Sequence, residues 1–347
     1  MEPNVSPSRL GLRYSRIVPD RSNGSSPLIA LDDTRAARER IRKLARTTPM
    51  LPAAELEEAI EGAVWLKCEN LQYTGSFKIR GAANFLAGLM EVNEPPAGVI
   101  TYSSGNHGQA VAAAARHYGL TAVVIAPETI PKLKLERMRE RGAEVLLCGT
   151  TSVERRERAE AEAAARGLTI VPPFDHPAII AGQSTAGLEM IEQRPDLRSI
   201  LVPVGGGGLL AGVAAAAKAL RPDCQIIGVE PEGSAAMRDS LRAGAPVTLP
   251  KTGSIADGLL PLRPGDLTFA HARAWVDQVV TVTEAAIIEA TLWLFERAHL
   301  VVEPSGAVTV AALRSGAAQP APPTVALLSG GNISIDGLAA LGRSPGI

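Results

Sequence analysis

A lysine at the predicted start of a helix is the residue whose type and position first suggest chemistry. Lys78 follows Ser76 and Phe77, shortly after the apolar run 64–68. Ser76 is the expected N-cap, which places Lys78 in the first helical turn, where unpaired N–H groups and the helix dipole disfavour another positive charge. We therefore expect a lowered pKa for the Lys78 amine, which suits Schiff-base formation with a carbonyl group. An ordinary solvated surface lysine is the alternative interpretation.

A short polar turn lies between a predicted strand and a predicted helix. Residues 103–109, Ser-Ser-Gly-Asn-His-Gly-Gln, follow the strand-like run 99–102 and precede the alanine-rich run 110–116. Such a turn directs backbone N–H groups outward at a helix N-terminus, where a carboxylate or a phosphate can bind. The alternative is an ordinary strand-to-helix turn capped by a serine or an asparagine.

Four consecutive glycines follow a second predicted strand. Gly205 to Gly208 lie between the run 200–204 and the helical run 210–220. Glycine leaves the backbone open to a ligand and reaches positive-φ conformations that aim several N–H groups at one anion, so we expect a phosphate there. The segment also fits the dinucleotide pattern G-x-G-x-x-A, with Glu230 as the ribose-binding acid. That interpretation gives no role to the lysine or the first turn, whereas a phosphate-bearing cofactor held by an imine uses all three.

Composition limits the class of protein. The chain has 347 residues, 46% hydrophobic and 20% charged, which is enough for large cores in two α/β domains. A net charge of −1 gives no electrostatic basis for binding nucleic acid or an anionic membrane. Cys68, Cys148 and Cys224 show no C-x-x-C pairing and the histidines no metal-ligand spacing, so we expect neither a disulfide framework nor a zinc site. Without a signal-peptide core before residue 30, we expect a cytoplasmic protein.

Six short motifs occur in an order that is typical of one family. They are residues 69–78, 103–109, 205–209, 254–258, 303–307 and 329–332. Through them the chain, from about residue 34 to residue 336, resembles the fold-type II pyridoxal phosphate enzymes, specifically the threonine/serine dehydratase and serine racemase group. The resemblance implies pyridoxal 5'-phosphate as the cofactor. It also implies an α/β fold like that of tryptophan synthase β, with two parallel-sheet domains and the cofactor in the cleft between them.

The resemblance further implies how the chain is divided. Residues 98–175 would form a small mobile domain, inserted into a large cofactor-binding domain made of residues 31–97 and 176–347. Residues 1–30 contain several prolines and no helical or strand periodicity, so we expect a mobile N-terminal arm. The pattern over 34–46 predicts an amphipathic helix. Beyond it strands alternate with helices, which is typical of a parallel sheet with crossover helices.

Cofactor contacts follow from matching the motifs residue by residue. Lys78 would form the Schiff base and later remove the α-proton of the substrate, and the glycine loop would hold the phosphate. Asn106 would hydrogen-bond the ring oxygen and Ser329 would face the pyridine nitrogen. A neutral hydroxyl there stabilises a pyridinium less than an aspartate would, which favours β-elimination over transamination. The implied cofactor-binding residues are Phe77, Lys78, Asn106, Gly205, Gly206, Gly207, Gly208, Leu209 and Ser329.

The substrate carboxylate is expected at the first turn. In the racemase branch the serine that matches Ser104 is a second acid/base on the opposite face of the cofactor, so Ser104 is a candidate catalytic residue and racemisation stays open. A cap or a carboxylate donor is its alternative role. Arg155 aligns with a racemase-branch arginine near the substrate, and an exposed helical arginine is the alternative there. The implied substrate-binding residues are Ser103, Ser104, Gly105, Asn106, His107 and Arg155.

A metal site of the family is incomplete in this chain. The divalent-cation site of the racemase branch uses a glutamate, a backbone carbonyl and an aspartate, which map onto Glu230, Ser234 and Ala236. Alanine supplies no ligand, so we expect weak cation binding unless water or Asp239 replaces the missing oxygen.

Together these features predict a pyridoxal phosphate-dependent ammonia-lyase. It would carry out β-elimination on a threonine- or serine-like β-hydroxy amino acid and give a 2-oxo acid and ammonia. Several β-hydroxy amino acids, including intermediates of hydroxyectoine breakdown, share every motif used here. An amino-acid racemase is the alternative, and a non-catalytic amino-acid-binding protein is a remote one. The family implies a homodimer or a homotetramer.

Overall fold

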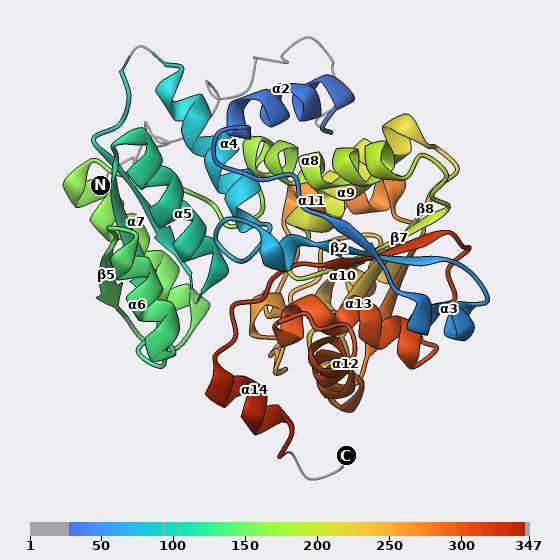
Figure 1. The fold of residues 1–347 in the computed structure, drawn as a ribbon. Coiled ribbons are helices and arrows are strands. Elements are labelled where there is room, and N and C mark those ends of the chain that lie inside the picture. The colour runs from blue at the N-terminus through green and yellow to red at the C-terminus, as the bar shows by residue number, and fades with distance from the viewer. Residues whose placement is uncertain (1–27, 93, 104, 344–347) are drawn as a thin grey trace.

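The computed structural model describes residues 28–92, 94–103 and 105–343. Most of the predicted arm, residues 1–27, and the candidate catalytic residue Ser104 therefore lie outside the described residues. The described strands form two separate sheets flanked by helices, so the chain has the predicted α/β fold (Figure 1).

The larger sheet holds the strands β1 (Met50–Pro52), β2 (Val64–Cys68), β7 (Ser199–Pro203), β8 (Gln225–Pro231), β9 (Gln278–Val282) and β10 (Thr324–Leu328). Their order is β1-β2-β10-β7-β8-β9. The edge strand β1 is antiparallel to β2, and all other neighbours are parallel. Strands β7 and β10 are buried along their whole length, which agrees with their near-continuous aliphatic sequences.

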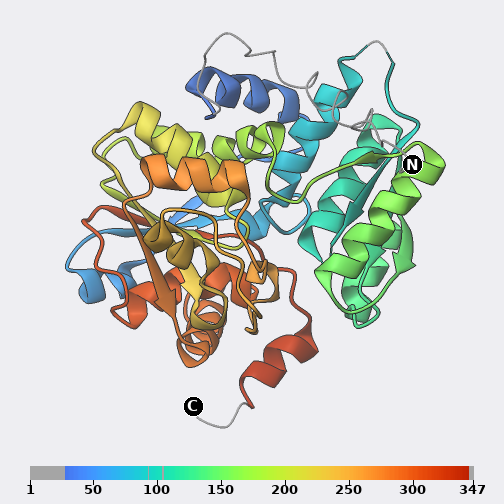
Figure 2. The same cartoon turned by 180° about the vertical axis from the view of Figure 1, so that it is seen from behind.

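Helices cover both faces of this sheet. The described α-helices outside the segment of the smaller sheet are α2 (Leu31–Ile41), α3 (Ala54–Ile60), α4 (Lys78–Met90), α8 (Pro177–Gln193), α9 (Gly208–Leu220), α10 (Ala236–Ala243), α11 (Asp266–Trp275), α12 (Glu284–Glu296), α13 (Pro304–Arg314) and α14 (Ile335–Leu341). In Figures 1 and 2, α8, α9 and α11 lie above the sheet and α12 and α13 below it. The two hydrophobic cores follow these layers, one against α8, α9 and α11 and one against α3, α12 and α13. Within the described ranges, every helix is too short or too polar to span a bilayer.

The smaller sheet is built from one continuous stretch of chain. Its strands are β3 (Gly98–Tyr102), β4 (Thr121–Ala126), β5 (Glu144–Leu147) and β6 (Thr169–Ile170), and its helices are α5 (Asn106–Tyr118), α6 (Lys132–Glu140) and α7 (Ser152–Arg166). The strand order is β5-β4-β3-β6, with all neighbours parallel. All four strands fall within the segment that the sequence predicts as an inserted domain.

Helix α4 lies between the helices of the two sheets. Its residues Ile79 and Phe85 share one buried cluster with Val111 of α5 and Ile179 of α8. Because α4 packs on both neighbours, its first residue is held where the two sheets meet.

The N-terminal helix is shorter than predicted. It was expected over 34–46 and spans Leu31–Ile41. Beyond the end of the helix, the side chain of Gln72 binds the backbone of Arg46. Gln72 Oε1 accepts the Arg46 N–H at 2.8 Å, and Gln72 Nε2 donates to the Arg46 carbonyl at 2.7 Å.

Candidate active site

A cavity of about 700 Å3 opens between the two sheets. Its walls are the turns that follow β3, β7 and β10, together with the start of α4. These turns lie at the carboxyl ends of parallel strands, where open α/β sheets bind ligands. Every predicted cofactor or substrate residue that the structure describes lines this cavity: Phe77, Lys78, Ser103, Gly105, Asn106, His107, Arg155, Gly205, Gly206, Gly207, Gly208, Leu209 and Ser329.

Lys78 is the first residue of α4 and extends into the cavity. Its Nζ donates to the carbonyl oxygen of Pro173 at 2.9 Å and lies 5.2 Å from the centre of the Phe77 ring. Burial lowers the pKa of the amine to about 8. The direction agrees with the sequence prediction, but the cause is loss of water around the charge rather than the helix dipole.

The predicted cap of α4 is wrong. Phe77 occupies the N-cap position, and no side chain caps the helix. Ser76 instead forms a β-bridge with Gly330, and its buried Oγ has no hydrogen-bond partner among the described residues. The backbone pairing of Ser76 thus sets where the helix begins.

The chain segment beside Lys78 connects the two sheets. Pro173 lies between β6 and α8, and two residues later the carboxylate of Asp175 accepts the backbone N–H groups of Asp266, Leu267 and Thr268 at 3.0, 3.0 and 3.1 Å. A carboxylate at this position caps the N-terminus of α11. The carbonyl that holds Lys78 is therefore fixed by a neighbouring anchor.

The glycine loop turns directly into α9. Gly207 has φ of +92°, and a methyl group in its place would lie 2.6 Å from the Met237 side chain. A methyl group on Gly206 would lie 2.4 Å from the Phe174 ring. Both positions therefore require glycine, and the first N–H groups of α9 have no partner within the helix. The loop is a site for an anion such as phosphate.

Glu230 does not play the part that a dinucleotide would need. Its side chain is fully buried, and its two oxygens accept the N–H groups of Met237 and Arg238 at 2.8 and 2.9 Å at the start of α10. Burial raises the pKa of Glu230 to about 7. Because this carboxylate faces α10 and not the cavity, the dinucleotide interpretation is wrong.

The other two positions of the incomplete cation site lie near Glu230. Ser234 Oγ donates to the carbonyl of Leu259 at 2.7 Å, and Ala236 is the first residue of α10. Among the described residues, no group of three or more His, Cys, Asp or Glu side chains is arranged to hold a metal ion.

Asn106 lies at the centre of a polar cluster that the sequence motifs did not reveal. Its Nδ2 donates to the carboxylate of Glu303, and its Oδ1 accepts from Asn332 Nδ2 at 2.7 Å. Burial raises the pKa of Glu303 to about 7. Nearby, Ser329 Oγ donates to the carbonyl of Ser305 at 3.3 Å. Glu303 and Asn332 lie in two of the sequence motifs. Their contacts with Asn106 could not be predicted, because residues so far apart leave no pattern in the local sequence.

Two predicted substrate residues have structural partners. Ser103 Oγ accepts the N–H groups of Gly105 and Gly108 at 3.2 and 3.1 Å and so caps the start of α5. The ring of His107 is buried with Nε2 3.2 Å from the Val171 carbonyl oxygen, and burial lowers its pKa to about 3. A neutral His107 ring therefore serves packing, although one edge reaches the cavity.

Arg155 enters the cavity from α7 and is not fully exposed. Its Nη1 donates to the carbonyl of Thr150 at 3.2 Å, while its buried Nε has no hydrogen-bond partner among the described residues. Arg155 is thus half-buried with an unpaired donor at the cavity wall, and its contact with the substrate stays a prediction.

The residues around the cavity fit a phosphate-bearing carbonyl cofactor. An amine with a pKa near neutrality and an anion-binding glycine loop face the same space. The amine can react with a carbonyl, and the loop can hold the phosphate. Ser329 places a neutral hydroxyl in the same cavity.

Comparison with known proteins identifies the family. The pyridoxal-phosphate dependent enzyme family matches residues 41–330. The chain is 40% identical over 309 residues to an L-threonine ammonia-lyase of Thermotoga maritima, covering 89% of this chain and 77% of that protein. It is 38% identical over 315 residues to an L-threo-3-hydroxyaspartate ammonia-lyase of a Pseudomonas species, covering 90% and 98%.

A solved structure gives the same result. Maize serine racemase superposes with a TM-score of 0.85 and 34% sequence identity, over 90% of this chain and 96% of the racemase. The chain belongs to the pyridoxal-phosphate dependent enzymes of fold type II, whose cofactor is pyridoxal 5'-phosphate.

Proposed function

We propose that this protein is an ammonia-lyase that removes the β-hydroxyl group of a β-hydroxy amino acid and releases a 2-oxo acid and ammonia. The observation that carries the proposal is the Lys78 amine, whose pKa of about 8 lets it gain and lose a proton near neutrality. The ammonia-lyase relatives support the same reaction.

The cofactor would be held at both ends of the cavity. Pyridoxal 5'-phosphate, when bound, supplies an electron sink that makes the α-proton of an amino acid acidic. Lys78 would carry it through a Schiff base, with the Phe77 ring beside the amine. The glycine loop and the Leu209 N–H would hold the phosphate, and the Ser329 hydroxyl would stand at the ring nitrogen. Asn106 would approach the ring oxygen.

The remaining residues would bind and orient the substrate. Gly105 and Asn106 begin α5, where Ser103 Oγ holds the N–H groups of Gly105 and Gly108, and the N–H groups of Asn106 and His107 would bind a carboxylate. The unpaired Nε of Arg155 adds a donor on the opposite wall. Lys78 would then accept the α-proton, and the departing hydroxyl would leave as water. Hydrolysis of the remaining enamine gives the 2-oxo acid and ammonia.

Racemisation is the second candidate function, and the similarity to maize serine racemase favours it. Racemisation needs a proton donor on each face of the substrate, whereas elimination needs only Lys78. The second donor would be Ser104. Ser104→Ala should abolish racemase activity and keep much of the elimination. Chiral chromatography and 2-oxo acid release on the same samples separate the two activities, and loss of both in step with the cofactor still bound would give Ser104 a positioning role.

We further propose that residues 98–175 move as a small lobe against a large lobe formed by residues 31–97 and 176–347. Support comes from the separate four-stranded sheet. Trypsin cleavage with and without substrate would check this division, and equal cleavage in both states would argue against it.

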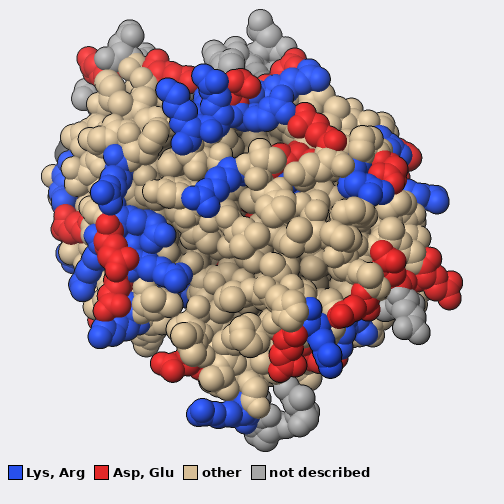
Figure 3. Space-filling view, in the orientation of Figure 1, with Lys and Arg blue, Asp and Glu red and all other residues tan. Residues whose placement is uncertain are grey.

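We also propose that the protein is a homodimer or a homotetramer in the cytoplasm. The centre of the surface in Figure 3 carries few charges. Leu71 and Val301 are 46% and 48% exposed, and Asn70 Nδ2 binds the Val301 carbonyl at 3.2 Å, which joins their two segments. Free, buried Cys68 and Cys224 suit a reducing compartment. Sedimentation of Leu71→Lys should show a smaller species than the wild type.

The proposed activity is tested by measuring 2-oxo acid and ammonia release from a panel of substrates. The panel contains threonine, serine, 3-hydroxyaspartate, phenylserine and β-hydroxy intermediates of hydroxyectoine breakdown. Equal amounts of both products are expected from at least one of them, with Lys78→Ala as the inactive control. Binding of an amino acid at equilibrium without turnover would instead indicate a binding protein.

A further inference from the structure

An ion pair between two residues of the cavity wall joins the two lobes. Lys134 lies in α6 of the small lobe, and its Nζ pairs with the carboxylate of Asp257, which begins the short helix η3 (Asp257–Leu259) of the large lobe. Both side chains line the cavity. None of the predicted roles uses either residue, although Asp257 lies in one of the motifs.

The two partners differ in exposure. The Lys134 side chain is 11% exposed, whereas that of Asp257 is 46% exposed. The lysine therefore approaches from inside the cavity and the carboxylate from its edge. A charge so far removed from water is costly without a partner, so separation of the lobes exchanges this pair for solvation of both groups.

Lys134 also lies against the turn that begins α5. A methyl group on Gly105 would lie 3.3 Å from Lys134 Cδ and 3.4 Å from Nζ. The lysine stem thus supports the backbone at the start of α5. Burial raises the pKa of the neighbouring Glu303, which is bonded to Asn106, and the charge of Lys134 opposes that rise.

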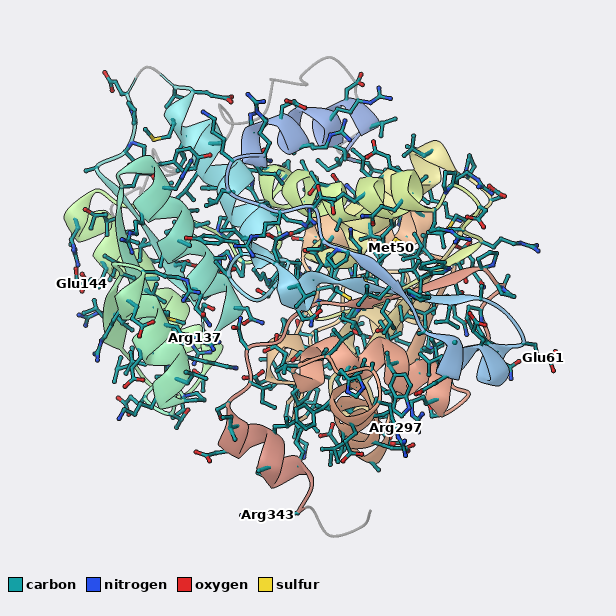
Figure 4. All side chains as sticks on the ribbon, viewed as in Figure 1. Met50, Glu61, Arg137, Glu144, Arg297 and Arg343 are labelled. Carbon is teal, nitrogen blue, oxygen red and sulfur yellow. The ribbon has the colours of Figure 1, made fainter. Side chains whose placement is uncertain are left out.

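A second contact holds the same helix. Arg137 lies one helical turn after Lys134, on the same side of α6, and its Nη1 donates to Asn332 Oδ1 at 2.6 Å. Figure 4 labels Arg137 on this helix. Asn332 in turn donates to Asn106. Helix α6 is therefore attached to the large lobe at two points, Asp257 and Asn332, and the second of these is bonded to Asn106 at the start of α5.

We propose that Lys134 is a positioning residue whose ion pair with Asp257 holds the lobes closed and fixes Gly105 and Asn106 against the carboxylate of the bound amino acid. The effect on substrate binding rests on the function proposed above. The closed arrangement of the two lobes depends only on the chain itself. Substrate enters when the pair opens, and the apparent affinity follows the fraction of molecules in which it is closed.

The decisive variants are Lys134→Met and Asp257→Asn, which remove one charge each and keep similar volume. We expect KM for the amino acid to rise roughly tenfold in either one, with a smaller change in kcat, because the closed fraction falls. The double variant should have a KM close to that of either single variant. Lys134→Arg should keep a KM near that of the wild type.

Lys132→Met is the matched control. Lys132 begins the same helix, and its ion pair with Glu136 is on the surface, with the Lys132 side chain 87% exposed. Its KM should stay unchanged. Raising the salt concentration should increase KM of the wild type and leave KM of Lys134→Met nearly constant, since the pair that salt weakens is already lost.

Hydrogen exchange of the chain without substrate provides the readout that does not need activity. Exchange in α6 and at the start of α5 should become faster in Lys134→Met and stay unchanged in Lys132→Met. A folded Lys134→Met protein with wild-type exchange and wild-type KM would overturn the proposal. If the wild type released no 2-oxo acid from any substrate, the proposed function would fail, whereas the exchange comparison would still decide whether the pair closes the lobes.

Discussion

Lys78 and Arg80 lie two residues apart on α4, on nearly opposite sides of the helix, and their surroundings differ sharply. Lys78 faces the cavity, where its Nζ donates to the Pro173 carbonyl. Arg80 is buried behind the helix, with Nε 2.8 Å from Glu69 Oε2 and Nη1 2.7 Å from Glu189 Oε1. One cation is desolvated without a counter-ion, and the other is bound by two carboxylates.

The network behind the helix extends further. Lys67 Nζ lies 2.7 Å from Glu189 Oε2 and also donates to the Thr48 carbonyl and to Gln193 Oε1 at 2.8 and 3.0 Å. Two buried cations and two buried carboxylates thus connect β2, α4 and α8. A buried cation that is bound by carboxylates, such as Arg80, therefore fixes the position of the helix. A buried amine without a counter-ion, such as Lys78, keeps its reactivity.

The largest effect should come from Lys78→Ala. We expect 2-oxo acid release to fall by at least about 10²- to 10⁴-fold, the usual contribution of one general base, and the visible absorbance of the bound cofactor to disappear. The melting temperature should change little, since no ion pair is broken. A borohydride-reducible adduct on another lysine in this variant would show that Lys78 has been given the wrong role.

Arg80→Met should instead act on stability. Removing one partner of a buried ion pair leaves uncompensated carboxylates, and we expect the free energy of unfolding to fall by about 3–5 kcal/mol in urea titrations. The matched control is Arg35→Met, since Arg35 and its partner Asp32 are 58% and 90% exposed. That pair should contribute no more than about 1 kcal/mol. Equal losses of unfolding free energy in the two variants would contradict the distinction between the buried and the exposed ion pair.

Gly207→Asp should weaken cofactor binding by roughly tenfold or more, as a carboxylate enters a loop that binds phosphate. The substitution also places a side chain at φ of +92° and close to Met237. Gly119→Asp is the control for placing an aspartate at a positive φ away from the glycine loop. Gly119 has φ of +69° at the end of α5, with no atom within 4 Å of an added Cβ. Titration of the apo protein with the cofactor should show a loss of affinity only for Gly207→Asp.

The smallest effect should be a dependence of stability on pH. The pKa of Lys78 falls from an ordinary value of 10.5 to about 8 in the folded protein, so between these values the unfolded chain binds more protons. The free energy of unfolding of the apo protein should therefore rise with pH from about 8 to 10.5, relative to Lys78→Met. Lys132→Met, which removes an exposed lysine, should follow the wild-type curve. A wild-type curve parallel to that of Lys78→Met would mean that the amine has an ordinary pKa.

The elements with strong local patterns could be predicted from the sequence. The runs 99–102 and 200–204 coincide closely with β3 and β7. The motif residues, from Lys78 to Ser329, meet in one cavity because they follow the carboxyl ends of parallel strands.

What the sequence did not predict depends on contacts between distant segments. The start of α4 is set by the bridge from Ser76 to Gly330, and the backbone of Arg46, beyond the end of α2, is bound by the side chain of Gln72. Lys134 and Asp257 meet although 123 residues separate them. Such contacts leave no periodicity or composition in either partner, so only the folded chain reveals them.

The hydrogen bond from Lys78 to Pro173 also bears on how the protein is made. The carbonyl that receives the amine lies 95 residues further along the chain, beyond the entire four-stranded sheet. A ribosome-bound chain that ends before Pro173 therefore carries an ordinary, hydrated ammonium at Lys78. The buried amine with its lowered pKa therefore forms only after the chain has returned to the larger sheet.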